Sequence, residues 1–200
     1  MDFDCLAIDY DDRVLTPRRW TARQSDWAAE LAGSATAGPL LELCSGAGHI
    51  GLLAARKSGR ALVAVDANPA ACEWARHNAK AAGVDLDMRC ADLAEALEPD
   101  ESFAVVIADP PWVEHDRVAT FSDDPVFAID GGVDGLDVAR LCLDVAAGHL
   151  TDDGVVLLQL GSLEQLGALV AQLEEHGLRI QDHLEEPDRG VVALLSRSAQ

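Results

Sequence analysis

Short apolar runs alternate with stretches of helical periodicity along most of the chain. Six runs and a weaker seventh are typical of buried strands, and they cover residues 40–43, 61–66, 86–89, 103–108, 155–160, 178–182 (the weaker one) and 191–195. Helices are expected between them, and also over about 21–32 and through 138–145. Buried strands separated by helices predict an α/β fold, with helices on both faces of a mostly parallel sheet.

Two further helices have clear signals at their ends. Asn68-Pro69 is an N-cap followed by proline at the first helical position, and Gly83 ends the apolar stripe that follows. Ser162 and Gln165 resemble a capping box. The stripe that begins there predicts one helix whose buried face carries Leu163, Leu166, Leu169, Val170 and Leu173.

Length and composition are typical of one domain with a sizeable core, since the chain has 200 residues of which 49% are hydrophobic. No apolar run approaches the ~20 residues of a membrane helix, and the acidic start lacks the pattern of a signal peptide. Five cysteines without a C-x-x-C pair predict free thiols and a cytoplasmic protein, not disulfides or a metal site. We expect residues 1–39 to form a lid or helix packed on the core, and residues 40–200 to form the main domain.

The charge balance narrows the choice of partner. Asp and Glu number 35 against 15 Lys and Arg, which gives a formal net charge of −20. Such a charge repels phosphate backbones, so it disfavours a nucleic-acid partner unless a local patch or a partner subunit supplies positive charge.

Three successive predicted strands end in acidic side chains. Gly46 and Gly48 allow a tight turn after the first strand, which carries Glu42, while Asp66 ends the second strand and Asp92 follows the third. Ligands of open parallel sheets bind at the carboxyl ends of the strands. These carboxylates could therefore hold an ammonium group, the ribose hydroxyls and the adenine amino group of an adenosine-containing cofactor.

The same turn leaves one alternative open. The glycines at positions 46, 48 and 51 match G-x-G-x-x-G literally, so a nicotinamide cofactor stays possible. A phosphate loop is excluded because no G-K-[ST] follows the turn.

The fourth predicted strand delivers Asp109-Pro110-Pro111-Trp112 to the same edge. To methylate a planar nitrogen, an enzyme must free its lone pair from resonance and aim it at the methyl donor. The Asp109 carboxylate can accept one N–H and the Pro110 carbonyl the other, while two prolines restrict the backbone. The Trp112 ring can stack on the planar group. We therefore assign catalytic roles to Asp109, Pro110 and Trp112.

These motifs resemble those of the class I S-adenosylmethionine-dependent methyltransferases, and among them the methylases that modify a glutamine amide in translation release factors. The resemblance runs from about residue 14 to residue 160. It rests on Pro17-Arg18-Arg19-Trp20-Thr21-Ala22, Glu42-Leu43-Cys44-Ser45-Gly46-Ala47-Gly48, Asp66-Ala67-Asn68-Pro69, Asn78-Ala79 and Gly131-Gly132-Val133-Asp134-Gly135-Leu136. It implies a Rossmann-like, seven-stranded sheet whose last strand is antiparallel. It also implies S-adenosylmethionine bound by Thr21, Glu42, Cys44, Gly46, Gly48, Asp66, Ala67, Asp92 and Asp109.

Three departures from those methylases bear on the substrate. Asp109 and Trp112 stand where they have Asn and Tyr, and Asp-Pro-Pro-[Tyr/Trp] resembles enzymes that methylate exocyclic amines of nucleic-acid bases. Ala22 stands where they have Glu. We also expect this chain to lack room for the N-terminal helical domain of the bacterial enzymes. Short relatives without that domain pair with a small partner protein, so we consider such a subunit here.

We expect an N-methyltransferase that acts on a planar nitrogen of a protein or peptide. The alternatives are a methyltransferase acting on a base of RNA or DNA, one acting on a small molecule, and a non-catalytic binding module with the same fold. The acidic segment 113–130 is either a solvated loop or a mouth for a basic protein, a peptide or an amine. His115 in that segment is a candidate proton relay, and Trp20 and Trp27 are expected to pack in the N-terminal helix.

Overall fold

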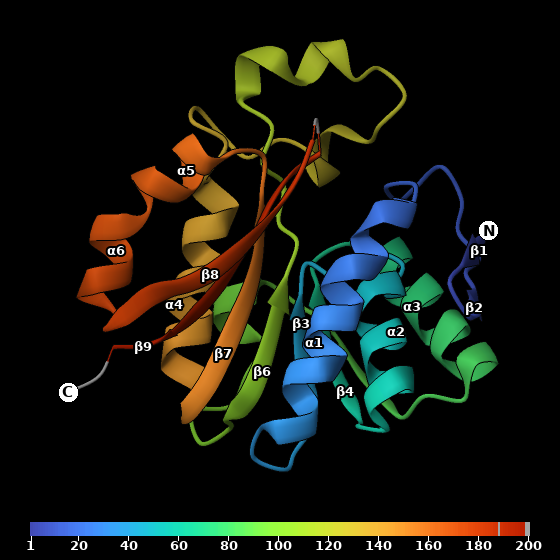
Figure 1. Ribbon diagram of the computed structural model, residues 1–200. Helices are drawn as coiled ribbons and strands as arrows, with labels where there is room; N and C mark the ends of the chain where they lie inside the picture. Colours follow the sequence, from blue (N-terminus) through green and yellow to red (C-terminus); the bar gives the residue numbers. More distant parts are fainter. Residues whose placement is uncertain (188, 199–200) are drawn as a thin grey trace.

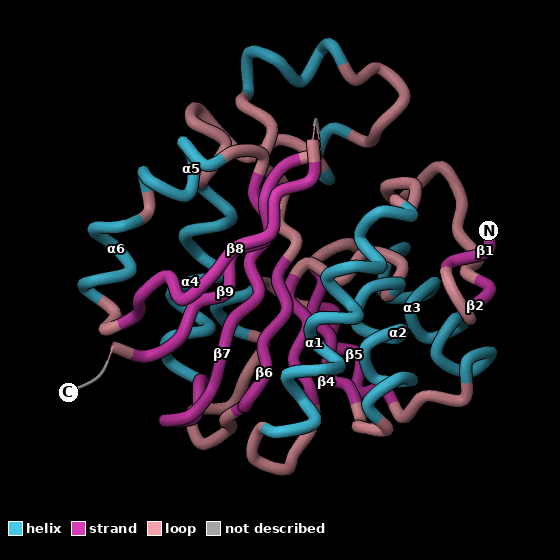
Figure 2. Tube along the Cα trace, in the orientation of Figure 1, coloured by secondary structure: helices cyan, strands magenta, loops and turns pink. Residues whose placement is uncertain are grey.

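Seven strands form one sheet in the order β5-β4-β3-β6-β7-β9-β8, and helices pack on both of its faces (Figures 1 and 2). The computed structural model describes residues 1–187 and 189–198. The strands are β3 (Leu40–Leu43), β4 (Leu62–Asp66), β5 (Leu86–Cys90), β6 (Phe103–Ala108), β7 (Leu150–Leu160), β8 (Leu178–Glu186) and β9 (Gly190–Arg197). The strands from β5 to β7 run parallel, and β9 is antiparallel to both of its neighbours. The expected fold class and the antiparallel last strand are confirmed.

The strand order reverses beside β3, which has β4 on one side and β6 on the other. In open parallel sheets the crevice for a ligand lies at such a reversal, outside the carboxyl ends of the strands. The topology therefore brings the ends of β3, β4 and β6 together, and with them the acidic residues singled out in the sequence.

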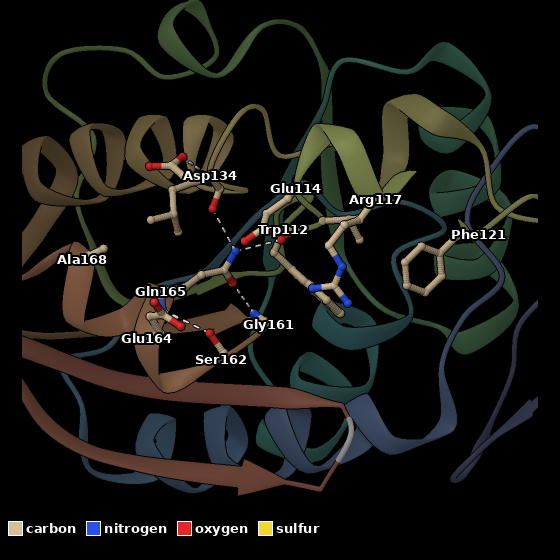
Figure 3. A pocket seen from close by; sticks show the side chains of 12 residues that line it. Trp112, Glu114, Arg117, Phe121, Asp134, Gly161, Ser162, Glu164, Gln165 and Ala168 are labelled. Carbon is tan, nitrogen blue, oxygen red and sulfur yellow. Dashed lines mark hydrogen bonds between the residues drawn. The ribbon is translucent and has the colours of Figure 1, made fainter. Parts of the chain in front are cut away.

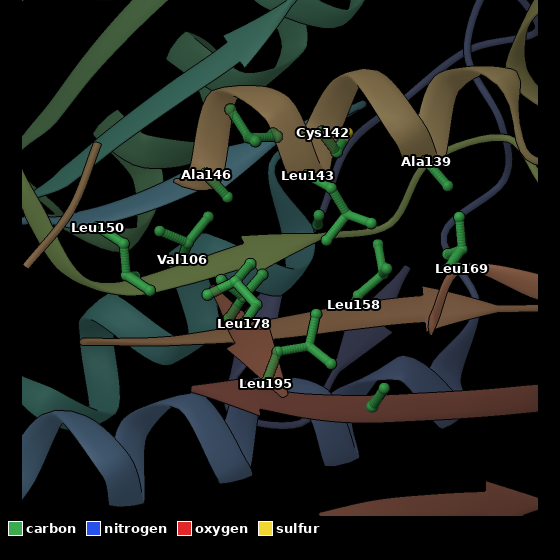
Figure 4. Packing of buried hydrophobic residues seen from close by; sticks show 14 of the residues in the cluster. Val106, Ala139, Cys142, Leu143, Ala146, Leu150, Leu158, Leu169, Leu178 and Leu195 are labelled. Atoms are coloured by element: carbon green, nitrogen blue, oxygen red, sulfur yellow. The ribbon is translucent and has the colours of Figure 1, made fainter. Parts of the chain in front are cut away.

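Two helical layers cover the sheet. They consist of α1 (Ala22–Ser34), α2 (His49–Ser58) and α3 (Pro69–Ala82) on one face, and of α4 (Asp137–His149), α5 (Leu163–Ala168) and α6 (Val170–Glu175) on the other. Alternate residues of β3 face the two layers: Leu40 packs with the first, whereas Leu41 and Leu43 pack with the second. Figure 4 shows the second core, in which apolar residues of α4 lie on β6 and β7. Burial on both faces explains why these strands are apolar at successive positions.

The end signals of α3 are confirmed. The Asn68 side chain accepts a hydrogen bond of 3.0 Å from the N–H of Ala70, Pro69 is the first helical residue, and Gly83 ends the helix at φ +65°.

The prediction of a single helix after Ser162 is wrong in two respects. It divides at Leu169 into α5 and α6, and Leu163 and Val170 are 44% and 39% exposed. Neither side chain belongs to the core that packs on the sheet. Only Leu166, Leu169 and Leu173 are buried.

The capping box is half formed. Ser162 Oγ accepts a hydrogen bond of 3.2 Å from the N–H of Gln165, but the Gln165 side chain bonds Gly161 and not Ser162. The glutamine has another role, described below.

The N-terminal segment adds a small hairpin that the sequence pattern did not predict. It consists of β1 (Asp2–Phe3) and β2 (Leu6–Ala7), two strands too short to show an alternating pattern. Across residues 1–187 and 189–198, no helix combines the length and the apolar character needed to cross a membrane.

Candidate active site

The ends of three neighbouring strands gather the acidic side chains at one edge of the sheet. Glu42 on β3 lies in register with Ala64 on β4 and Ile107 on β6. Asp66 ends β4 and Asp109 directly follows β6, so both lie close to Glu42 at the reversal of strand order. The negative charges of Asp109 and Asp66 contribute to the raised pKa of Glu42, which reflects this closeness.

The turn after β3 is left-handed at three positions. Cys44, Gly46 and Gly48 have φ values of +58°, +53° and +80°. A Cβ atom on Gly46 would meet nothing within 4 Å, whereas one on Gly48 would press on Leu52 and Ala75 at 3.1 and 3.2 Å. Gly46 therefore leaves its backbone open to a ligand, and Gly48 lets the turn pack against α2 and α3.

Asp66 ties the turn to the next strand. Its Oδ2 accepts a hydrogen bond of 2.7 Å from the N–H of Gly46, and its Oδ1 accepts one of 2.8 Å from the N–H of Asn68. Burial raises its pKa, and these two hydrogen bonds oppose the shift. A carboxylate oxygen has more than one acceptor site, so both atoms can still accept from the hydroxyls of a ribose.

Glu42 is 2% exposed and has one free oxygen. Its Oε1 accepts a hydrogen bond of 2.9 Å from the N–H of Gly51, while Oε2 has no partner among the described residues. Burial raises the pKa of Glu42 to about 8. A Cβ on Gly51 would collide with Oε2, so the third glycine of the literal G-x-G-x-x-G match makes room for this carboxylate.

The remaining residues expected to bind a cofactor differ in how far they are exposed. Ala67 and Asp92 are exposed at the ends of β4 and β5. Thr21 is buried, and its hydroxyl donates a hydrogen bond of 2.7 Å to the carbonyl of Arg18. The Cys44 thiol turns toward α4, where its Sγ lies 3.8 Å from that of Cys142, so only its backbone faces the turn.

Asp109 and Pro110 present two free acceptors. Within the described part of the chain, neither the Asp109 carboxylate nor the Pro110 carbonyl receives a hydrogen bond. Burial raises the pKa of Asp109 to about 7. Both acceptors are therefore available to receive the two hydrogens of an amide or amine nitrogen.

Two glutamines hold the ends of Ala108-Asp109-Pro110-Pro111-Trp112. Gln24 of α1 donates from Nε2 to the carbonyls of Ala108 and Leu157, at 3.2 and 3.1 Å. Gln165 of α5 donates from Nε2 to the carbonyl of Trp112 at 2.9 Å. No sequence pattern marks Gln24, and the spacing of Gln165 from Ser162 indicates only a helix cap.

Gln165 also joins two other segments to Trp112 (Figure 3). Its Nε2 donates to the carbonyl of Asp134 at 3.2 Å, and its Oε1 accepts from the N–H of Gly161 at 2.8 Å. A Cβ on Gly135 would collide with Gln165 Nε2 and the Trp112 carbonyl, and one on Gly161 would lie 2.5 Å from the Trp112 ring. Asp134 and Gly135 of the Gly131–Leu136 motif therefore help to seat Trp112.

A cavity of about 220 Å³ lies beside Trp112, between α5 and the segment that follows β6 (Figure 3). Its walls include Glu114, Arg117, Phe121 and Ser162. His115, the candidate relay, is largely exposed and is held by Asp130, with Nδ1 at 2.7 Å from Oδ2. In residues 1–187 and 189–198, no three His, Cys, Asp or Glu side chains are grouped to hold a metal ion.

Residues 28–128 match the family described as methyltransferase small domain. The chain belongs to this family. It is 34% identical to the ribosomal protein uL3 glutamine methyltransferase of Bradyrhizobium diazoefficiens, over 80% of this chain and 55% of that protein. It is 33% identical to the release factor glutamine methyltransferase of Mycolicibacterium smegmatis, over 76% of this chain and 56% of that protein. The chain thus spans about half the length of these curated relatives.

Solved structures agree on the fold. The ribosomal protein L11 methylase of Lactobacillus delbrueckii superposes with a TM-score of 0.70 at 17% identity, covering 96% of this chain and 86% of that one. The fold is therefore the Rossmann-like fold of class I methyltransferases, and the resemblance drawn from the sequence to the glutamine methylases is confirmed.

Proposed function

We propose that this protein is an S-adenosylmethionine-dependent N-methyltransferase that modifies a side-chain amide, that of a glutamine, in a ribosomal protein or translation factor. The observation that carries the proposal is the pair of free acceptors at Asp109 and Pro110, held at the carboxyl edge of the sheet. The names of the relatives support the choice of a glutamine amide.

The residues present fit the cofactor. Gly46 leaves open space above the turn, Asp66 offers two oxygens with acceptor sites to spare, and Glu42 has a buried oxygen without a donor. We assign Asp66 to the ribose, Glu42 to the ammonium group and Asp92 to the adenine. When bound, S-adenosylmethionine supplies a methyl group on a positively charged sulfur.

The residues of this chain orient the substrate amide, whose nitrogen receives the methyl group. The Asp109 carboxylate and the Pro110 carbonyl each accept one N–H of the substrate amide, which turns the nitrogen lone pair toward the methyl group. Trp112, seated on Gly161, stacks on the amide plane. The acceleration comes from this orientation and from the negative charge of Asp109 near the positive charge that develops on nitrogen.

A second candidate is a methyltransferase that acts on an exocyclic amine of a nucleic-acid base. Asp109 and Trp112 favour it, since they replace the Asn and Tyr expected of glutamine methylases. The net charge of −20 counts against it, because phosphate contacts supply most of the affinity of nucleic-acid binders.

The proposal also covers the parts of the molecule around the site. Residues 1–39 form a segment that covers the site, supported by the Gln24 contact with Ala108 and by an ion pair of 2.7 Å between Arg18 and Asp124. Residues 40–200 form the catalytic domain. A cytoplasmic location is part of the proposal, supported by the proposed substrates, which belong to the translation machinery. A small partner subunit stays a prediction, which size-exclusion chromatography of a cell extract would check.

The test uses tritiated S-adenosylmethionine with the wild-type protein, Asp109→Ala and the control Asp100→Ala, which changes an exposed acid in a loop. The methyl acceptors are purified release factor and ribosomal protein uL3 from the same organism, together with protein, RNA and small-molecule fractions of its lysate. We expect label in protein that depends on Asp109 but not on Asp100. Label confined to RNA or to a small molecule would overturn the proposal.

A further inference from the structure

One segment stands clear of both helical layers beyond the carboxyl edge of the sheet (Figure 1). We call residues 113–131, which follow directly on Trp112, the arm. Its two ends are joined, since the N–H of Val113 donates to the carbonyl of Ile129 and the N–H of Gly131 donates to the carbonyl of Val113, both at 2.9 Å. The arm is therefore a closed surface loop and not a loose connection.

The inner side of the arm is fixed to the active site. Val113, Val118 and Ile129 are buried and pack against Trp112 and Leu15. On the N-terminal side, both oxygens of Asp124 lie 2.7 Å from the Arg18 guanidinium. These contacts tie the arm to Trp112, which lies three residues after Asp109, and to the N-terminal segment.

The outer side of the arm exposes large apolar side chains. Val126 and Phe127 are 58% and 57% exposed, while Phe121, on the wall of the cavity beside Trp112, is 38% exposed. The chain has four phenylalanines, and the two outside the arm, Phe3 and Phe103, are buried. An apolar patch with aromatic residues beside a catalytic site is typical of a surface that contacts another macromolecule.

The charges on the arm select the kind of partner. Asp124 and Asp130 are paired with Arg18 and His115. The other acids of the arm, and its one arginine, have no ion-pair partner in the described structure; they are Glu114, Asp116, Asp123 and Arg117. Three free acids against one arginine leave the arm negative, which favours Lys and Arg on the partner and repels phosphate.

We propose that the arm is the docking surface for the protein substrate. It receives apolar side chains of that protein on Val126 and Phe127, flanked by basic side chains that face the free acids. This inference rests on the proposed function, because it supposes that the methylated amide belongs to a protein. It adds that recognition extends beyond the amide to a folded surface next to it.

The experiment compares two substrates of the same enzyme. One is the purified protein, release factor or uL3, that the wild-type enzyme labels, and the other is a short peptide around the labelled glutamine. The variant is Val126→Ser with Phe127→Ser. The control is Leu141→Ser with Val170→Ser, which removes two exposed apolar side chains from α4 and α6, outside the arm.

We expect the arm variant to raise KM for the intact protein about tenfold, as the loss of central apolar contacts at an interface does. Its KM for the peptide, its kcat and its affinity for S-adenosylhomocysteine should match those of the control variant. Equal KM values for wild type and variant on the intact protein would overturn the docking surface alone. An equal loss on both substrates would do so too, because the arm would then act on the amide itself. Label confined to RNA in the wild-type assay would overturn both proposals.

Discussion

At the scale of single residues, two features shape the site. Burial raises the pKa values of two carboxylates, and two glutamines hold the segment from Ala108 to Trp112 by hydrogen bonds. Glu42 and Asp109 both have raised pKa values, about 8 and about 7, because desolvation disfavours their charged forms. A group with such a pKa changes its charge near neutral pH, so the pH dependence of the reaction reports on it directly.

Asp109 should impose a pH dependence on turnover. Its carboxyl is protonated below about pH 7 and ionised above it, and the ionised form stabilises positive charge on the substrate nitrogen. We expect kcat/KM to rise as pH increases through about 7. Asp109→Asn keeps an acceptor oxygen but does not titrate, so it should stay active with a flat profile. An identical rise in wild type and Asp109→Asn would assign the titration to another group.

Gln165 acts as a positioning residue, because both ends of its side-chain amide bond backbone groups: Nε2 donates to the carbonyls of Trp112 and Asp134, and Oε1 accepts from the N–H of Gly161. Gln165→Leu removes its donors, and the loss of a fixed backbone at Trp112 should lower kcat about tenfold to a hundredfold. KM and the affinity for S-adenosylhomocysteine should be unchanged. The matched control is Gln172→Leu on α6, which loses comparable hydrogen bonds to Arg140 and Asp144 away from the site. If both variants lost kcat equally, general loosening of the fold and not the position of Trp112 would explain the effect.

At the scale of elements, the Gly131–Leu136 motif is a structural connector between β6, the arm and α4. Gly135 has φ +73°, and an added Cβ would collide with Gln165 and with the Trp112 carbonyl. The motif is therefore rich in glycine because three backbone segments and the Gln165 side chain meet there without room for side chains.

The surroundings of two glycines, one in this connector and one in α4, predict opposite effects of substitution on stability. Gly135→Ala should destabilise the protein by at least about 1–2 kcal/mol, the cost of a left-handed residue with a Cβ, to which the collision adds. Gly148→Ala, near the end of α4 with nothing within 4 Å of the new Cβ, should stabilise it by about 0.5–1 kcal/mol. Urea denaturation followed by circular dichroism would measure both. An unchanged midpoint for Gly135→Ala would show that the connector relaxes easily.

At the scale of the whole molecule, a net charge of −20 acts on stability as well as on the choice of partner. Like charges on one compact surface repel each other, and they repel less in the expanded unfolded chain. The surface around the arm shares this excess of acids, so the same charge that weakens the folded state favours a basic protein substrate.

Salt should therefore stabilise the folded protein. The Debye length falls from about 30 Å at 0.01 M ionic strength to about 3 Å at 1 M, which screens this repulsion. We expect Tm to rise with NaCl over this range and equally with KCl, as measured by differential scanning calorimetry. A Tm that stays constant or falls would mean that the ion pairs of this surface contribute more than its net repulsion.

The sequence by itself determined the features that depend on neighbouring residues. Apolar runs marked the strands, because a strand buried on both faces has no polar side. Asn68, Pro69 and Gly83 marked the ends of α3, because a cap bonds backbone groups within a few residues. Glu42, Asp66 and Asp109 were found because an acid at the end of a strand is visible in the chain itself.

Only the tertiary structure decided what depends on segments far apart in the chain. Gln24 reaches Ala108, and Gln165 reaches Trp112, across separations that no local pattern records. Leu163, Val170 and Phe127 are exposed although they are hydrophobic, because their exposure depends on how distant segments pack. The pKa of Asp109 likewise follows from its burial. Burial and long-range contacts are properties of the packed chain, which is why the sequence indicated the groups of the site but not how they are held.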